Sequence, residues 1–394
     1  MLTMHETKNE LRSLADSIGR SNVRYEDVLK SSERRGGVRR VSAGIVAVIV
    51  VVASGSFLAR AFDDTPRQPG ARSVDDVRGS ISFTVAENGR VAEGETIGIV
   101  QAPGSSPVLV TGYPDPDTGG WSPDGRWIAF TRPAGSSPPN YDIWVAAADG
   151  SHERQLTSGP AADFAAQFSP QGDQIMFLRT AASRSPALML MDADGGGLRR
   201  IAGADDEVIF DASWSPDGRR ILMIGHPGEE GEMNWLAVMD ADGTDRRVVY
   251  KGAYNEPSWS PDGNHIVISS GGSLLVVPVD GGGSTQVLDG IDRQGLAEVA
   301  WSPDGANILY TRPIDSTQTE ELWVMPVSGG SPQRVTQGLQ WRDASPAWAP
   351  DGDAIAFVRD GDIWTVDLLT NQQSRITSSP EYESDPAWAV SEDA

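Results

Sequence analysis

The chain has 394 residues, contains no cysteine and carries a formal net charge of −23 at pH 7. Without cysteine it can have no disulfides, no thiol catalysis and no lipid-modified N-terminal cysteine. An acidic excess of this size favours solubility, and it disfavours nucleic acid and other anionic surfaces as partners.

The first 62 residues predict a short tail followed by a membrane-spanning segment. Residues 1–40 are basic overall, and residues 41–59 contain no charged side chain. A helix of those nineteen residues is about 28 Å long, close to the thickness of a bilayer hydrocarbon core. Arginines cluster just before this run, so the positive-inside rule places the tail in the cytoplasm. We predict a retained transmembrane helix over residues 41–62, with the rest of the chain extracytoplasmic.

Two features of this region allow other interpretations. The segment 59–61 has the A-x-A shape of a signal-peptidase site, which would make the apolar run a cleaved signal peptide. In the tail, Leu11, Leu14 and Ile18 follow helical spacing and would suit docking of a cytoplasmic regulator or contact with the bilayer. The ELRSLAD start, the arginine cluster and the predicted span are similar in layout to bacterial membrane proteins associated with sigma factors.

Residues 63–79 are a polar linker containing Pro and Gly, and residues 80–394 are dominated by a repeat. The phrase WSPDG stands intact at 121–125, 214–218, 259–263 and 301–305, is altered at 168–172 and 348–352, and leaves a remnant, PAWAV, at 386–390. The aromatic anchors of these phrases are 40 to 47 residues apart: Trp121, Phe168, Trp214, Trp259, Trp301, Trp348 and Trp388. A period of this size, with four strands per unit, predicts an all-β propeller.

The strands can be followed through the unit that starts at Trp121. Its Ser-Pro-Asp-Gly segment predicts a turn, because Pro fixes φ at the second position and Gly accepts a positive φ. A strand over 127–131 follows, then a strand containing DIWV that ends at the turn dipeptide Asp149-Gly150. The RQLT segment is the expected fourth strand.

The two ends of the repeat region complement each other. Residues 81–111 match strands two to four of a unit without a leading WSPDG strand, whereas residues 384–390 match a leading strand with nothing after it. We predict that residues 384–390 form the innermost strand of the first blade, which closes the ring and removes its open edges. The prediction is therefore seven blades, with six as the alternative.

This pattern resembles the TolB-like propeller family, whose repeat also occurs in the propeller of prolyl-oligopeptidase-type enzymes. The residues that carry the resemblance are the WSPDG phrases, the DIWV and LMLMDADG strands, and the RQLT and RVT ends. The resemblance implies the propeller fold. It leaves function open, because the family includes periplasmic binding scaffolds and accessory domains of enzymes.

An acidic residue lies three to five positions before every anchor: Asp117, Asp163, Asp211, Glu256, Glu298, Asp343 and Asp385. The innermost strand of each blade lines the central channel, so these acids are expected around one mouth of it. There they would attract cations or a basic peptide. The alternative is that each acid accepts local backbone hydrogen bonds and only fixes its loop.

Arginine recurs eleven residues after four of the anchors and would neutralise nearby acids: Arg132, Arg179, Arg312 and Arg359. Two units carry Gly225 and Ser270 at this position instead. The acidic field is therefore expected to be least compensated near Asp211 and Glu256.

Motifs for catalysis are absent: the sequence has no G-x-S-x-G and no H-E-x-x-H. We predict no enzyme activity, no cofactor and no bound metal. The predicted function is a membrane-anchored, extracytoplasmic scaffold that binds a protein or basic peptide at its mouth and signals through its cytoplasmic tail. The alternative is a metal-dependent propeller hydrolase that uses channel carboxylates.

Overall fold

The computed structural model describes residues 81–389, apart from 87–95, 101–106, 111–119, 134–139, 181–184, 204–206, 228–232, 255–256, 289–297, 315–318, 337–338, 341–344 and 379–381. All regular secondary structure in these residues is β. None of them belongs to a helix long and apolar enough to cross a membrane. The predicted tail (1–40), transmembrane helix (41–62) and linker (63–79) lie outside the described residues.

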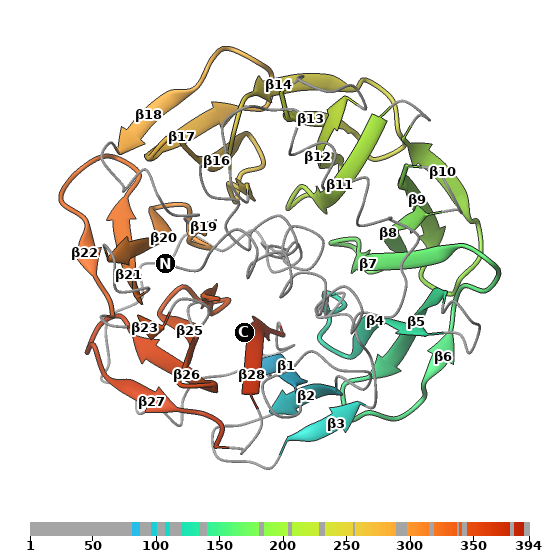
Figure 1. The fold of residues 1–394 in the computed structure, drawn as a ribbon, viewed down its shortest axis with the longest axis horizontal. Helices are drawn as coiled ribbons and strands as arrows, with labels where there is room; N and C mark the ends of the chain where they lie inside the picture. Colours follow the sequence, from blue (N-terminus) through green and yellow to red (C-terminus); the bar gives the residue numbers. More distant parts are fainter. Residues whose placement is uncertain are drawn as a thin grey trace, which may run out of the picture.

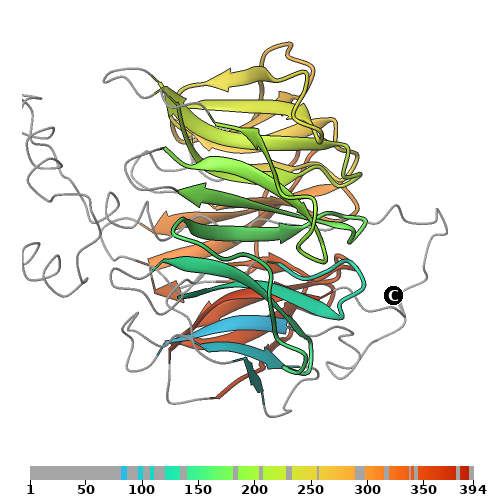
Figure 2. The same ribbon diagram turned by 90° about the vertical axis from the view of Figure 1, so that its right-hand side faces the viewer.

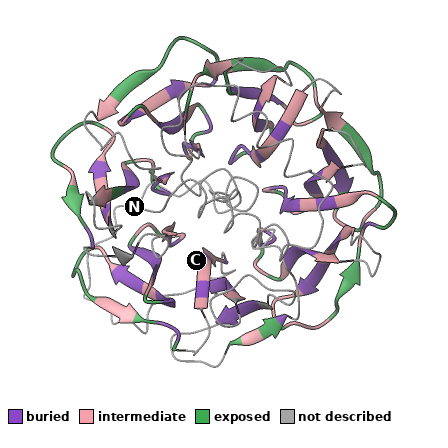
Figure 3. Ribbon diagram, in the orientation of Figure 1, coloured by how far each residue is buried: buried purple, intermediate pink, exposed green. Residues whose placement is uncertain are grey.

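The strands form seven antiparallel sheets arranged as blades around a central axis (Figure 1), and Figure 2 shows the blades from the side. The seven-bladed prediction is confirmed. In each blade the strand or bridge that carries the aromatic anchor lies nearest the axis, and the strand at the other end of the sheet lies at the rim (Figure 1). The exposed residues gather on these rim strands (Figure 3).

Blades 1 to 4 contain strands β1 to β14 and the last strand, β28. Blade 1 combines β28 (Tyr382–Trp388), β1 (Ile81–Ala86), β2 (Thr96–Val100) and β3 (Val108–Val110). Blade 2 contains β4 (Trp127–Pro133), β5 (Tyr141–Ala147) and β6 (Arg154–Gln155), with Trp121 bridged to Ile128 at the inner position. Blade 3 contains β7 (Ala162–Phe168), β8 (Gln174–Thr180), β9 (Ala187–Asp192) and β10 (Arg199–Ala202). Blade 4 contains β11 (Glu207–Trp214), β12 (Arg220–Pro227), β13 (Trp235–Asp240) and β14 (Arg247–Lys251).

Blades 5 to 7 complete the ring. Blade 5 contains β15 (Ser258–Trp259), β16 (His265–Ser270), β17 (Ser273–Pro278) and β18 (Thr285–Leu288). Blade 6 contains β19 (Val299–Trp301), β20 (Asn307–Ile314), β21 (Thr319–Pro326) and β22 (Gln333–Arg334), and β23 (Leu339–Gln340) also pairs with β21. Blade 7 contains β24 (Ala347–Trp348), β25 (Ala354–Arg359), β26 (Asp362–Asp367) and β27 (Gln373–Arg375).

The ring closes where the two ends of the repeat region meet. β28 pairs antiparallel with β1, from Ile81 opposite Trp388 to Ala86 opposite Tyr382. The predicted closing strand is confirmed, although it begins two residues earlier than expected. A register shift between Ser82 and Thr84 accommodates the change.

The Ser-Pro-Asp-Gly segments are tight turns between the first and second strands, as predicted. After Trp214, the Ser215 hydroxyl donates to Asp217 Oδ1 at 2.7 Å and accepts from the Arg220 amide at 2.9 Å. The Arg219 amide also donates to Asp217 Oδ1, at 3.0 Å. Burial would raise the pKa of Asp217, but the hydrogen bonds from Ser215 and Arg219 and the charges of Arg220 and Arg219 together hold the pKa below its usual value. The turn therefore satisfies its own polar groups.

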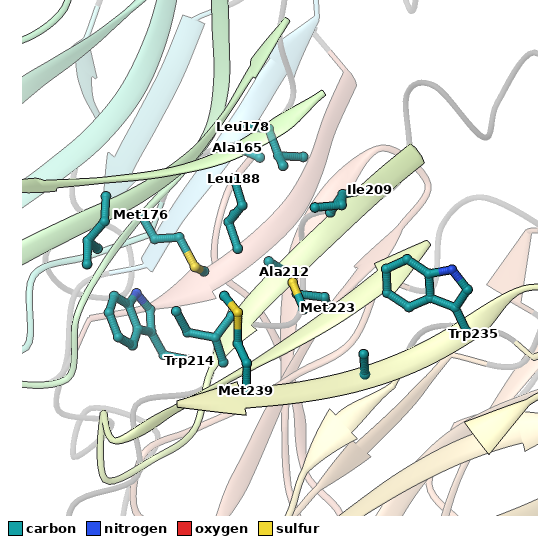
Figure 4. Packing of buried hydrophobic residues seen from close by; sticks show 13 residues of the cluster. Ala165, Met176, Leu178, Leu188, Ile209, Ala212, Trp214, Met223, Trp235 and Met239 are labelled. Atoms are coloured by element: carbon teal, nitrogen blue, oxygen red, sulfur yellow. The ribbon is translucent and has the colours of Figure 1, made fainter. Parts of the chain in front are cut away.

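Neighbouring blades bury their apolar faces against each other, because one four-stranded sheet cannot cover both of its own faces. Between blades 3 and 4, Figure 4 shows the packing of Met176, Leu178, Leu188, Trp214, Met223 and Trp235. Anchor tryptophans also reach the preceding blade: the indole Nε1 of Trp348 donates to the carbonyl of Ala300, and that of Trp388 to the carbonyl of Ala347. Apolar burial and these bonds fix each blade against its neighbour.

Candidate functional site

The candidate site is the mouth of the channel, defined as the end of the ring at which the chain enters the innermost strands. The opposite end carries the Ser-Pro-Asp-Gly turns and is called the turn face. Four of the seven predicted mouth acids lie in described residues: Asp163, Asp211, Glu298 and Asp385. Asp117, Glu256 and Asp343 lie outside them. The complete acidic ring therefore stays a prediction.

Asp163 is only 1% exposed and is neutralised by an arginine of its own blade. It lies opposite Arg179 in the β7–β8 pair, and its two carboxylate oxygens accept from Nε and Nη2 of that arginine at 2.6 and 2.7 Å. This confirms the predicted compensation in blade 3. A second buried carboxyl, Asp142 of blade 2, has its pKa raised by burial and by the charge of Asp163.

Asp211 is half-buried and follows a β-bulge in β11, where the register shifts between Ile209 and Asp211. Burial raises the pKa of Tyr254, and the charge of Asp211 raises it further. Gly225 leaves room here for the indole of Trp235: a Cβ on Gly225 would lie 2.5 Å from that ring. The glycine that replaces the recurring arginine therefore has a packing role.

Glu298 and Asp385 are held in different ways. The Glu298 amide donates to Thr311 Oγ1 at 3.0 Å, and the Thr311 amide donates to the Glu298 carbonyl at 3.0 Å. Asp385 accepts from Ser384 Oγ at 2.7 Å and from Ser345 Oγ of blade 7 at 3.3 Å. Burial raises the pKa of Asp385, against these hydrogen bonds, which lower it. The contact between Ser345 and Asp385 links two neighbouring blades at the mouth.

The other recurring arginines contact outer parts of their blades. Arg132 Nη2 donates to Glu153 at 2.8 Å, and its guanidinium lies 4.2 Å from the centroid of the Trp144 ring. Arg359 Nη1 donates to Gln373 at 2.6 Å. Arg312 lies over Trp323, 5.6 Å from the ring centroid. Stacking on the tryptophan of the third strand therefore orients Arg132 and Arg312. The spacing of the arginines in the sequence did not predict these contacts.

Sequence reasoning also missed two aromatic contacts in blade 4 and in the segment that connects it to blade 5. Phe210 and His226 lie with ring centroids 5.0 Å apart, and Tyr250 and Tyr254 are 5.9 Å apart in an edge-to-face contact. The only signal in the sequence was the loss of the recurring arginine from these two units. Within the described part of the chain, no three His, Asp or Glu side chains are grouped so as to hold a metal ion.

The sequence is similar to known protein families and to curated proteins. Family profiles match the TolB beta propeller domain over residues 116–289 and the dipeptidyl peptidase IV N-terminal region over residues 313–390. A Tol-Pal system protein TolB of Francisella tularensis subsp. mediasiatica is 31% identical over 225 residues, 43% of this chain and 50% of that protein. An uncharacterized protein of Agrobacterium fabrum is 27% identical over 152 residues, 34% of this chain and 49% of that protein. The chain thus spans about half the length of the curated relatives it matches.

Solved structures share the fold at low sequence identity. TolB from Acinetobacter baumannii has a TM-score of 0.50 at 17% identity, over 78% of this chain and 82% of that chain. An oligogalacturonate lyase in complex with manganese has a TM-score of 0.57 at 12% identity, over 77% of this chain and 87% of that chain. At these identities the likeness shows the fold alone.

Seven radial sheets, closed by the strand at the end of the repeat, define a β-propeller. The kind of β-propeller is indicated by three observations: the matching family profile, the TolB relatives and the recurring WSPDG turns. The domain is a TolB-like β-propeller, a class that is consistent with a protein-binding scaffold.

Proposed function

We propose that the protein is a membrane-anchored, extracytoplasmic scaffold whose propeller mouth binds a basic segment of a partner protein. The observation that carries the proposal is the acidic residue that recurs in the sequence shortly before the aromatic anchor of every blade of the TolB-like ring. Curated relatives are named as proteins of the Tol-Pal system, which supports a protein partner. The cytoplasmic tail, residues 1–40, would pass the binding signal to a regulator.

The attachment of the predicted anchor supports an accessible mouth. β1 begins at Ile81, which pairs with Trp388 at the turn face. Because residue 80 is bonded to Ile81, the predicted linker joins the propeller at the turn face. The anchor is therefore tethered to the end opposite the mouth, and the mouth is free to face away from the membrane.

Binding of a basic probe tests the proposed partner chemistry. A fluorescein-labelled hexa-arginine peptide, titrated against the full-length chain in neutral detergent, should raise the fluorescence anisotropy at low salt. Affinity should fall between 0.01 and 0.1 M salt, where the Debye length shortens from about 30 to about 10 Å. A hexa-glutamate peptide is the control. Equal binding of both peptides, or of neither, contradicts the proposed basic partner.

Protease protection tests the proposed topology. Protease added to intact spheroplasts should degrade the propeller and leave a small N-terminal fragment that contains residues 1–40. The uncharged run and the arginine cluster motivate this expectation. Recovery of a soluble mature protein that begins near Phe62 would show cleavage instead.

A further inference from the structure

One of the recurring arginines, Arg312 of blade 6, differs from its counterparts. These arginines lie at corresponding positions near the mouth end of the second strand in blades 2, 3, 6 and 7: Arg132, Arg179, Arg312 and Arg359. Three of them donate a hydrogen bond to a side chain of their own blade: Arg132 to Glu153, Arg179 to Asp163 and Arg359 to Gln373. Arg312 is exposed, and within the described part of the chain no hydrogen bond or ion pair engages its guanidinium.

A β-bulge accounts for the ion pair of blade 3. The register of β7 and β8 shifts after Phe164, and Ala165 at this point has a φ of 55°. The shift aligns Asp163 with Arg179. Because successive side chains of a strand point to opposite faces of the sheet, residues that are aligned in this way share a face, and the carboxylate meets the guanidinium.

In blade 6 the corresponding strands, β19 and β20, align without a shift over their described pairs. Val299 lies opposite Tyr310, and the Thr311 amide donates to the carbonyl of Glu298 at 3.0 Å. Glu298 therefore shares a face with Thr311, and Arg312 lies on the opposite face of the blade. The register of this strand pair does not bring Arg312 to Glu298.

The carboxylate directly opposite Arg312 is already paired with other groups. Glu321 lies opposite Arg312 in the β20–β21 pair, and its Oε1 accepts from Arg334 Nη1 at 3.0 Å. Its Oε2 accepts from the indole Nε1 of Trp323, also at 3.0 Å. The guanidinium of Arg312 lies over the ring of Trp323, 5.6 Å from the ring centroid. Stacking of this kind orients a guanidinium and leaves its N–H edge available to a ligand.

Blade 5 packs against the same face of blade 6, and its described strands, β15 to β18, contain no Asp or Glu. Tyr310, which shares the face of Arg312, belongs to one apolar cluster with Val267 of blade 5. At the mouth end of blade 5, the hairpin between β16 and β17 consists of two glycines, residues 271–272. A Cβ on Gly271 would have no described neighbour within 4 Å. The described strands next to Arg312 therefore offer it no carboxylate.

We propose that Arg312 binds a carboxylate of the partner segment, supplied by an aspartate, a glutamate or the C-terminus. A guanidinium holds a carboxylate through two parallel N–H···O bonds, which fix its orientation as well as its position. This inference rests on the proposed function, in which acidic residues of the mouth attract basic side chains. It adds that the partner carries a carboxylate among those basic side chains, and that this carboxylate sets the direction in which the segment crosses the mouth.

The test uses the full-length chain in neutral detergent and the low-salt buffer of the anisotropy assay. The probes are fluorescein-labelled hexa-arginine peptides in which one position at a time is replaced by glutamate or by glutamine. Glutamate adds a negative charge, so an acidic mouth without a free cation would bind the glutamine peptide more tightly at every position. Binding by Arg312 predicts at least one position at which the glutamate peptide binds about three- to fivefold more tightly, as for an exposed ion pair.

Variants of the arginines show whether Arg312 causes this preference. Arg312→Gln should abolish it, and Arg312→Lys should keep only part of it, because lysine has the charge without the planar fork. Arg132→Gln is the matched control and should keep the preference, since the Arg132 guanidinium is already bound to Glu153. Melting curves show whether each variant folds; if Arg312→Gln does not, Arg312→Lys decides the result.

Two results overturn the inference and leave the proposed function standing, provided that hexa-arginine itself binds. One is a preference for glutamine at every position, and the other is a preference for glutamate that survives Arg312→Gln. Failure of wild type to bind any of the peptides overturns both the inference and the proposed function.

Discussion

The closing strand offers the sharpest test of how the ring is held together. Deletion of residues 382–394 removes β28 and leaves β1 as an open inner edge. Two apolar side chains of β1 lose their cover: Ile81, which is 4% exposed, and Phe83, which is fully buried. Both belong to the cluster between blades 7 and 1 that also contains Val100, Val358 and Trp388.

The size of the effect follows from these contacts. Exposing a buried Ile or Phe side chain costs about 1.5–3 kcal/mol each, so the two together cost about 3–6 kcal/mol. In the full-length chain, ordering β28 costs conformational entropy. This cost is roughly offset by the backbone hydrogen bonds of β28 and by the burial of Trp388, so these contributions to the effect of the deletion nearly cancel. Total stabilities are about 5–15 kcal/mol, so the deletion removes a large share. A loss of this size should lower the melting temperature by about 5–9 °C.

The measurement is thermal unfolding followed by circular dichroism, with deletion of residues 390–394 as the matched control. The control keeps β28 and Ala389 and should melt like the full-length chain. A protein lacking 382–394 that melts within 2 °C of the control, with wild-type cooperativity, would refute the argument that β28 closes the ring. The 2 °C margin corresponds to about 1.3 kcal/mol for a domain of this size.

Three substitutions at buried sites test the electrostatics and packing of the blades. Burial raises the pKa of Glu320 to about 7. The contribution of the neutral Glu320 carboxyl to stability is therefore complete below about pH 4.5 and is lost as the pH rises through 7. Glu320→Gln should therefore stabilise the protein at pH 8 by up to about 3 kcal/mol but not at pH 4, in urea titrations at both pH values. Asp163→Asn leaves Arg179 without its buried counter-charge and should lower the free energy of unfolding by about 3–5 kcal/mol. A change below about 1 kcal/mol in the same urea titration would contradict a structural ion pair. Gly225→Ala places a Cβ against the carbonyl oxygen of Val208 and the ring of Trp235 and should cost about 1–3 kcal/mol by denaturant unfolding; an unchanged midpoint would contradict the packing role of Gly225.

The fold was predictable because the repeat is local. Each WSPDG turn is specified by a few adjacent residues, and the distance between anchors gives the number of strands in a unit. Closure could be predicted because the two ends of the repeat region complement each other. The exact start of β28 could not, because it depends on the register shift opposite Ser82 and on the left-handed backbone of Asp385, with φ of 52°.

The contacts at the mouth were less predictable, because they form between blades or across a sheet. Spacing placed Arg179 near Asp163 correctly, since these residues pair directly on adjacent strands. The same spacing did not predict that Arg132 would stack on Trp144 and bind Glu153. The aromatic contacts of Phe210 with His226 and of Tyr250 with Tyr254 were also hidden, because hydrophobic spacing along one strand does not show which rings meet across a sheet or after it.

The two ends of the ring use polar residues for different purposes. At the turn face, the same serine–aspartate hydrogen bond recurs in blades 2, 4, 5 and 6. Hydrogen bonds hold the pKa of Asp262 low, against its burial, as they do for Asp217. A group that is already satisfied within its own turn has little left to offer a ligand. At the mouth, the residues in corresponding positions differ: an ion pair in blade 3, aromatic rings in blades 4 and 5, and a serine–aspartate contact between blades 7 and 1. Because a symmetric ring cannot fix the orientation of an asymmetric partner, the proposed binding of a partner at the mouth would depend on these differences between blades.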